Sequence, residues 1–395
     1  MLASDRAFWI CSRVAAGCAF AVAMAFVLSP SACLLTVSLD GLADGELPVD
    51  AGVGGGGGTG GTSGCKVGFA DCNTDSVCET NIASDKLNCG TCNHSCQGST
   101  CTGGRCDPVL LASGNSPVAL AQDDTYIYWA DKGTSDIKRY RKDNSGQVDP
   151  LATGQANPTD IAVDDTNVYW SLASGTVTST TKVPGGVPKN LATQQSPLAI
   201  ALDGTSIYWV NGTSGSVEKA PKAGGTKTTL ASGVMGPSDI AVGGSDVYFI
   251  AFGESKLKKV STSGGTPTDV ATGLHNPLSI VLDGTYIYLA EQGTDAESFA
   301  DGAISRITRA TVNKEVLAPM QGAPHSVAVA PKSDYAYWGL FNNQIVMAVQ
   351  LPPAGQAAPS AVSIATELAG SAISVLADDK AVYWISGANI VKVAR

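Results

Sequence analysis

One line of sequence recurs seven times and constrains the fold more than any other feature. Each copy begins near a proline, which is missing only from the last copy, and continues with two variable residues and an apolar stretch. A short turn and a second apolar stretch follow, and the second stretch usually ends on an aromatic residue. The copies begin at Ser116, Asn157, Ser196, Gly236, Asn276, Ala323 and Ser371. Their ends lie 39 to 49 residues apart, which is the length of one four-stranded blade. The sequence therefore predicts an all-β fold, a seven-bladed β-propeller over residues 109–395.

Most copies can be divided into four strands, here named A to D. In the third copy the strands are 198–203, 206–211, 216–222 and 226–232. Paired glycines at 185–186, 224–225 and 264–265 permit the positive φ of tight turns between strands C and D. In five copies strand A ends on an aspartate, which we expect to bond to the turn backbone: Asp123, Asp164, Asp203, Asp283 and Asp378.

The two ends of the repeat region predict how the ring closes. The chain finishes on a C-type strand, 388–395, and no D strand follows it. The segment 108–113 resembles the D strands of the other copies. We expect this segment to complete the last blade, because pairing the two ends removes two open sheet edges.

All cysteines lie within the first 106 residues of the chain. Three lie at 11, 18 and 33, and none follows Cys106. A dense, even set predicts a small disulfide-rich module over 65–106 in an oxidising compartment, with pairings that the sequence leaves open. A redox or zinc role for Cys89 and Cys92 is the less favoured alternative. The eight cysteines of the module are Cys65, Cys72, Cys78, Cys89, Cys92, Cys96, Cys101 and Cys106.

The same module carries oxygen-bearing side chains at alternating positions. Hard oxygen ligands with this spacing suit Ca²⁺, so the sequence offers a calcium site, although an EF-hand would need glutamate where Ile82 stands. Polar turns between disulfides are the alternative reading. No other cofactor is predicted. The calcium candidates are Asp71, Asn73, Asp75 and Glu79. Three stretches, around 71–75, 78–80 and 88–92, resemble the small Cys-rich modules of secreted bacterial surface proteins.

The N-terminal part is typical of an exported protein. Residues 1–32 have the basic start, apolar run and small residues of a signal peptide. Ser31 and Ala32 resemble the positions before a lipidated Cys33, whereas Pro30 departs from the bacterial lipobox. Lipidation, ordinary cleavage near Ala32 and an uncleaved anchor are the open alternatives. Residues 33–64 include a glycine-rich run and predict a flexible tether.

Candidate site residues lie where the loops before strand A and after strand B share one face. His275 and His325 precede or begin strand A on adjacent blades, and the longest loop, 291–302, is acidic. Asp160 and Asp239 occupy the second position after the proline in two blades. Histidines beside carboxylates can bind a metal or transfer protons. The candidates on this top face are His275, His325, Asp160, Asp239, Glu291 and Asp295.

Two resemblances bear on the function of the propeller. Tyr128–Asp131, reading YWAD, resembles the YWTD blades of lipoprotein receptors, which are binding propellers. The blade count and His325 after Pro324 resemble seven-bladed bacterial lyases that open cyclic peptide lactones with histidines and Mg²⁺. The first resemblance concerns the type of blade. The second implies a hydrolase or lyase with a metal-assisted histidine site.

The function expected from the sequence is binding without catalysis. No G-x-S-x-G, HExxH or P-loop pattern is present, and the formal charge of −10 without a basic patch argues against nucleic acid. The expected partner is a protein, peptide or glycan at the top face, with membrane contact only through the N-terminal anchor. The expected location is outside the cytoplasm, as an outer-membrane or cell-surface lipoprotein or as a secreted protein.

Overall fold

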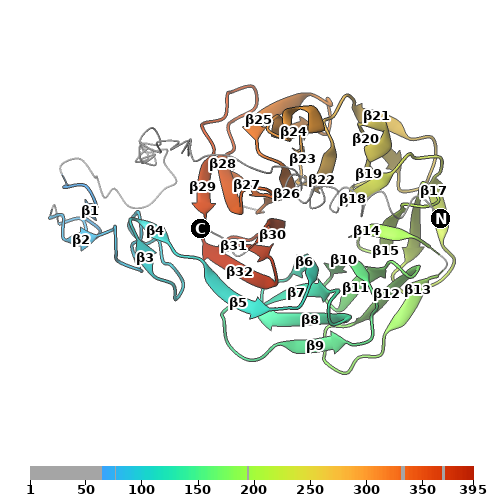
Figure 1. Cartoon of the computed structure of the whole chain (residues 1–395), viewed down its shortest axis with the longest axis horizontal. Coiled ribbons are helices and arrows are strands. Elements are labelled where there is room, and N and C mark those ends of the chain that lie inside the picture. The colour runs from blue at the N-terminus through green and yellow to red at the C-terminus, as the bar shows by residue number, and fades with distance from the viewer. Residues whose placement is uncertain (1–64, 76, 194, 331–333, 367–369) are drawn as a thin grey trace, which may run out of the picture. The chain divides into compact units, whose positions relative to one another are not determined.

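The computed structural model describes residues 65–395, apart from 76, 194, 331–333 and 367–369. The signal peptide, Cys33 and the tether lie outside the described residues. The described chain is a seven-bladed propeller, in which seven four-stranded antiparallel sheets form a ring, preceded by a disulfide-bonded module (Figure 1). The predicted fold is therefore confirmed. Within the part of the chain that is described, no helix is long and apolar enough to cross a membrane.

Strands A and B form the inner half of each blade. The A strands lie innermost and are, in blade order, β6 (Pro117–Gln122), β10 (Pro158–Val163), β14 (Pro197–Leu202), β18 (Pro237–Gly243), β22 (Pro277–Leu282), β26 (Pro324–Val329) and β30 (Ala372–Ala377). The B strands are β7 (Tyr126–Asp131), β11 (Asn167–Leu172), β15 (Ser206–Asn211), β19 (Asp246–Ala251), β23 (Tyr286–Glu291), β27 (Tyr335–Leu340) and β31 (Ala381–Ser386).

Strands C and D form the outer half. The C strands are β8 (Asp136–Arg141), β12 (Thr176–Thr181), β16 (Ser216–Pro221), β20 (Lys256–Ser261), β24 (Gly302–Thr308), β28 (Ile345–Gln350) and β32 (Asn389–Ala394). The D strands are β9 (Asp149–Ala152), β13 (Lys189–Ala192), β17 (Thr228–Ala231), β21 (Thr268–Ala271), β25 (Lys314–Gln321), β29 (Val362–Ala365) and β5 (Val109–Ser113). Two short 3₁₀ turns, η1 (Phe252–Glu254) and η2 (Asp295–Glu297), lie between strands B and C.

The repeated aromatic residue of strand B supplies the core. Each B strand is covered on both faces, because neighbouring blades pack sheet against sheet. Its side chains are accordingly mostly apolar on both faces, and the residue at the repeated aromatic position, which is leucine in blade five and phenylalanine or tryptophan elsewhere, is fully buried. This position is held by Trp129, Trp170, Trp209, Phe249, Leu289, Trp338 and Trp384.

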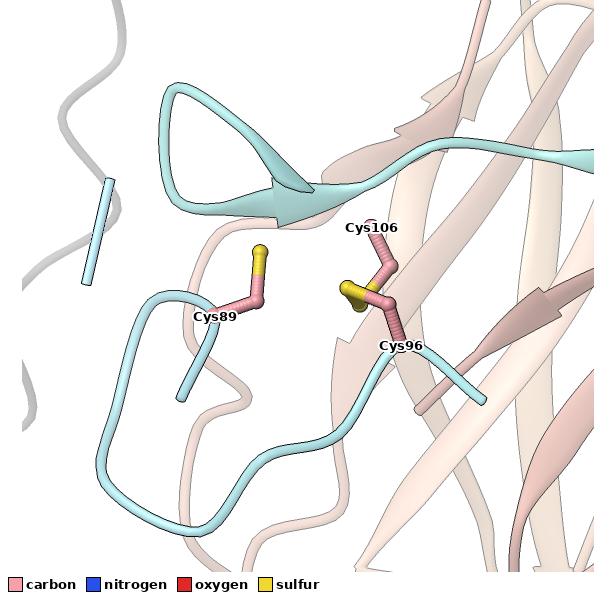
Figure 2. Close-up of side chains that lie close together, drawn as sticks. All are labelled: Cys89, Cys96 and Cys106. Carbon is pink, nitrogen blue, oxygen red and sulfur yellow. A yellow bond between two sulfur atoms is a disulfide. The ribbon is translucent and has the colours of Figure 1, made fainter. Parts of the chain in front are cut away.

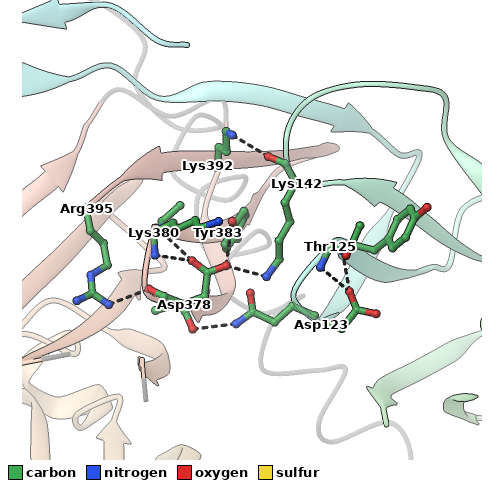
Figure 3. Close-up of polar contacts among 12 residues, drawn as sticks. Asp123, Thr125, Lys142, Asp378, Lys380, Tyr383, Lys392 and Arg395 are labelled. Atoms are coloured by element: carbon green, nitrogen blue, oxygen red, sulfur yellow. Dashed lines mark hydrogen bonds and ion pairs between the residues drawn. The ribbon is translucent and has the colours of Figure 1, made fainter. Parts of the chain in front are cut away.

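The ring closes as the sequence predicts. β5 pairs antiparallel with β32, so the first strand of the propeller is strand D of the last blade. Side chains reinforce the junction between blades seven and one: Lys392 Nζ donates to the carbonyl of Lys142 (2.8 Å), and Lys142 Nζ donates to Asp378 (2.7 Å; Figure 3). Both lysines are buried, so each must find an acceptor within the protein.

The turn aspartates behave as predicted and also join neighbouring blades. Asp123 accepts the backbone N–H groups of Thr125 and Tyr126, the hydroxyl of Tyr128 and the ammonium group of Lys182 from the next blade. Burial alone would raise the pKa of Asp123, but the bonds from Lys182, Tyr128 and the backbone lower it to about 2. The same pairing of an aspartate with a lysine of the following blade occurs at Asp164–Lys222 and Asp378–Lys142.

The cysteine module contains four disulfides and two small hairpins. The hairpins are β1 (Phe69–Ala70) with β2 (Thr80–Asn81) and β3 (Cys101–Thr102) with β4 (Arg105–Cys106). Cys89 and Cys92 bond to different partners, so the module has neither a CxxC redox pair nor the thiolates of a zinc site. Figure 2 shows the bond between Cys96 and Cys106 beside Cys89. The pairs are Cys65–Cys78, Cys72–Cys92, Cys89–Cys101 and Cys96–Cys106.

Deleting 108–113 should lower the melting temperature of the propeller or cause aggregation. Without β5, the outer edge of β32 exposes unpaired backbone groups and the apolar residues around Ile390. The control is a deletion of equal length from the glycine-rich tether, 52–57. Differential scanning calorimetry of both variants measures the effect, and an unchanged transition in the 108–113 variant would contradict closure through this strand.

Candidate functional site

The loops before strand A and those after strand B form one face of the ring. In six blades the first residue after strand B donates its N–H to the carbonyl of the residue before the A-strand proline, which fixes the two loops together. The donors and acceptors are Lys132–Ser116, Ala173–Asn157, Gly212–Ser196, Phe252–Gly236, Gln292–Asn276 and Phe341–Ala323, at 2.9–3.1 Å. This face, called the top face below, is where the sequence placed its candidate site.

His275 lies exposed on the top face beside a carboxylate. Its Nδ1 is 3.3 Å from Asp301 Oδ2, and its side chain is 55% exposed. Asp301 is itself held by the N–H (2.7 Å) and hydroxyl (2.9 Å) of Thr294. These bonds from Thr294 are the main cause of the lowered pKa of Asp301, with a smaller contribution from His275. The pair is therefore an oriented imidazole and carboxylate that can exchange a proton.

His325 is placed differently from the expectation that it joins His275 at the mouth. It lies on β26, and its ring stacks on Phe341 with centroids 5.7 Å apart. Burial lowers the pKa of His325 to about 4, so the imidazole is neutral at physiological pH. Among the described residues, the polar contact of His275 is with Asp301 and the ring contact of His325 is with Phe341, so the structure shows no shared histidine site.

Glu291 belongs to the framework of the face. It is 4% exposed, accepts the N–H of His275 (3.1 Å) and the hydroxyl of Ser305 (3.2 Å), and pairs with Lys314 (2.5 Å). Asp131, at the same end of strand B in blade one, holds its own loop in the same way. The register of strand B could have revealed this equivalence from the sequence. Asp295, in contrast, is exposed on η2.

Asp160 and Asp239 hold the centre of the ring together. Asp160 accepts the N–H of Ile161 in its own blade and that of Ile200 in the next, both at 2.8 Å. Asp239 accepts from Ile240 (2.8 Å) and Ile280 (2.7 Å) in the same way. Each carboxylate thus uses both oxygens on backbone groups. The sequence could not show the contacts with Ile200 and Ile280, because these residues belong to the neighbouring blades. Ligand binding by Asp160 and Asp239 stays a prediction.

These bonds complete a set of seven. Strand A has an irregular register near its start in every blade, after the first residue in blades one to six and after the second, Ile373, in blade seven. In each blade the third residue after the proline position donates its N–H to a side chain. Where a blade has serine at the second position, that hydroxyl accepts the N–H of the next blade. The serine contacts are Ser279–Val327, Ser326–Val375 and Ser374–Leu120. Where a blade has alanine at this position, as at Ala119 and Ala199, it offers no acceptor to the next blade. The aspartate of that next blade then accepts the N–H of the residue that follows it, Ile161 or Ile240, in addition to the N–H from the blade beyond.

Asp160→Ser should destabilise the propeller, because a single hydroxyl oxygen replaces the two carboxylate oxygens that accept the N–H groups of Ile161 and Ile200 separately. Ile161 would lose its acceptor, which costs about 1–3 kcal/mol when the group is buried. Adding Ala119→Ser supplies a new acceptor for Ile161, as Ser374 does for Leu120. The double variant should therefore recover most of the lost stability in urea denaturation. A double variant no more stable than Asp160→Ser would show that the loss of stability does not come from the unpaired N–H of Ile161.

The same double variant tests the charge at the centre of the ring. Burial raises the pKa of Asp160 to about 7, and burial with a contribution from Asp160 raises that of Asp239 to about 7. Between about pH 4 and about pH 7 the folded state holds a proton that the unfolded state has released, so ionisation reduces stability. Parent stability should fall relative to the Ala119→Ser/Asp160→Ser variant across that range. Identical pH dependence in urea denaturation would show that Asp160 is ionised throughout.

The calcium candidates are brought together in part. Carboxylate oxygens of Asp71, Asp75 and Glu79 lie within 4.8 Å of one another. Asp71 Oδ1 also accepts the N–H of Thr74 (2.7 Å), and Asn73 and Asp75 bond to each other. These contacts are those of polar turns, the alternative named above. Calcium binding at this cluster stays a prediction.

Comparison with known proteins identifies the fold and no family. No family model and no curated protein matches the chain. Among solved structures, it is similar to a catalytically inactive virginiamycin B lyase from Staphylococcus aureus with quinupristin, at 13% identity and TM-score 0.60, covering 73% of this chain and 98% of that one. The chain is also similar to hydrazine synthase of Kuenenia stuttgartiensis, at 15% identity and TM-score 0.60, covering 72% of this chain and 97% of that one. A chain of a nidogen–laminin complex is 19% identical, with a TM-score of 0.47, and the match covers 60% of this chain and 97% of that one.

Proposed function

We propose that this protein binds a ligand on the top face of its propeller and catalyses no reaction. One observation carries the proposal: the acids expected to do chemistry are occupied by the framework. Asp160 and Asp239 each accept two backbone N–H groups, and Glu291 is buried against Lys314. A rigid ring with a varied loop face is suited to recognition, because the loops can differ while the blades stay the same. The ligand class is a protein, peptide or glycan.

The proposed location is outside the cytoplasm. Four disulfides in the module are typical of an oxidising, extracytoplasmic environment. The protein is either attached to a membrane through a lipid on Cys33 or released after cleavage of the signal peptide. In either case the tether of 33–64 would separate the anchored or processed end from the folded modules.

Catalysis by the pair His275–Asp301 is the second candidate. It is favoured by the exposed imidazole and the fixed carboxylate, which together form a general base. The resemblance of the sequence to seven-bladed bacterial lyases implies a cyclic peptide lactone as the substrate class, with Mg²⁺ as the metal. At 13% identity this likeness concerns the fold. His325, the histidine that follows Pro324 as in the lyases, is half-buried, and desolvation keeps its imidazole neutral.

The parent protein should not linearise quinupristin in the presence of Mg²⁺, as followed by mass spectrometry. His275→Ala is the matched variant, because Ala156 occupies the equivalent loop position in blade two. This variant should have the same melting temperature as the parent and, like the parent, should leave quinupristin cyclic. Turnover by the parent that is lost in His275→Ala would overturn the binding proposal in favour of the lyase.

A further inference from the structure

The top face is chemically uneven, although the blades beneath it are alike. The first residue after strand B makes the same backbone bond in six blades, so its side chain is free to vary. It is small or polar in blades one, two, three and five and aromatic in blades four and six. The residues are Lys132, Ala173, Gly212, Phe252, Gln292 and Phe341. Phe252 packs in part against the core of blades four and five, and Phe341 stacks on His325. Both side chains are half-buried, so each also presents apolar surface to the top face.

Further apolar side chains lie near the same face in blades four and five. Met235, in the loop before β18, is 59% exposed, and Met320, near the end of β25, is 72% exposed. Phe299 lies half-buried in the long loop of blade five. We name Met235, Phe252, Phe299, Met320 and Phe341 the apolar rim.

Backbone bonds show that the rim is continuous across blades four to six. Gly253 N bonds to Met235 O (3.0 Å), and Leu274 N bonds to Ser255 O (3.0 Å), which brings the loop of His275 against blade four. Gly293 N then bonds to His275 O (3.0 Å). Two further bonds lead into blade six: Ala323 N donates to Phe299 O (3.1 Å), and Phe341 N donates to Ala323 O (3.1 Å).

Unfavourable backbone conformations collect in the same loops. The positive φ of Ala323 recurs at the equivalent residues Asn157, Gly236 and Asn276, so it belongs to the repeat. Phe299 (φ 62°) and Met320 (φ 55°) are also left-handed, a region that bulky residues rarely adopt. Such conformations persist where the surrounding structure imposes them, and they gather at binding sites. Their position here is an observation independent of the apolar side chains.

The charge beside the rim has one sign. The rim loops, 232–236, 252–255, 272–276, 292–301, 319–323 and 341–344, contain four carboxylates and no lysine or arginine. Asp301 pairs with His275, and Glu254 is paired with Lys258. Asp295 and Glu297 are exposed, and no partner holds either side chain among the described residues. An apolar surface next to free carboxylates complements a ligand that is both apolar and cationic.

We infer that the apolar rim and the acidic loop 292–301 bind a basic peptide segment in which lysine or arginine stands beside aromatic or apolar side chains. The inference rests on the proposed function and names its ligand class. The aromatic side chains of the segment pack against the phenylalanines and methionines of the rim. Its cationic groups pair with Asp295 and Glu297.

The test is fluorescence polarisation with the oxidised mature chain and a labelled peptide of alternating lysine and tryptophan. Two matched peptides replace lysine by glutamate or tryptophan by serine. The lysine–tryptophan peptide should bind at least about tenfold more tightly than either, and more weakly as salt rises. Equal binding of all three peptides, or none by the first, would overturn the inference.

Variants locate the site. Phe252→Ala/Phe341→Ala introduces the residue found at this position in blade two, and affinity should fall about tenfold. The variant also removes the contacts of Phe252 with the core and of Phe341 with His325, so its melting temperature is measured beside its affinity. Asp295→Asn/Glu297→Gln should weaken binding and flatten its salt dependence. The controls lie in turns at the other end of the strands: Val183→Ala/Val187→Ala for apolar exposure and Asp124→Asn/Asp165→Asn for charge.

The outcomes separate this inference from the proposal on which it rests. Affinity that falls equally in the control variants would show attraction to the net charge of −10 and would overturn the rim as the site, while leaving a non-catalytic platform intact. Turnover dependent on His275 would overturn the platform itself, whatever the rim binds. Thermal melting of each variant confirms that lost binding does not reflect lost folding.

Discussion

The pairing of β5 with β32 is the interaction on which the rest of the propeller depends. Each blade buries both faces of its B strand against its neighbours, so a ring with one open junction would expose two apolar sheets. The junction is closed by main-chain bonds between the two ends of the repeat region and by the buried lysines Lys142 and Lys392. Every other blade then has a neighbour on both sides.

The centre and the lower turns of the ring solve a second problem, which is the satisfaction of backbone N–H groups between blades. Serine and aspartate do this at the centre, where one carboxylate such as Asp160 substitutes for two hydroxyls. Aspartates such as Asp123 do it at the turns and also bind a lysine from the next blade. Polar residues on the inner strands are therefore explained by the framework before any ligand is considered, because buried donors need acceptors.

Once these framework residues are set aside, the asymmetry of the loops remains. Blades one to three use short loops of small and polar residues, whereas blades four to six carry aromatic residues, exposed methionines and unpaired acids. The repeated blades provide an internal comparison, because equivalent positions share a backbone bond and differ only in side chain. That comparison supports recognition by one side of the top face, with His275 at its middle.

The sequence by itself determined the features that repeat or are local. Seven copies gave the blade count and strand order, the missing D strand gave the closure, and each turn aspartate gave its own cap. An even number of crowded cysteines gave a disulfide module, because free thiols are disfavoured where such modules are found. In each case the information lies within one blade, one turn or the spacing of a repeat.

The tertiary structure alone decided which partners distant residues take. The cysteine pairs, the double role of Asp160, the framework position of Glu291 and the burial of His325 depend on groups from other strands or blades. The sequence showed these side chains at regular positions and could not show what faced them. A polar side chain is free to meet a ligand only where the neighbouring backbone does not already use it, and that neighbour is set by the closed ring.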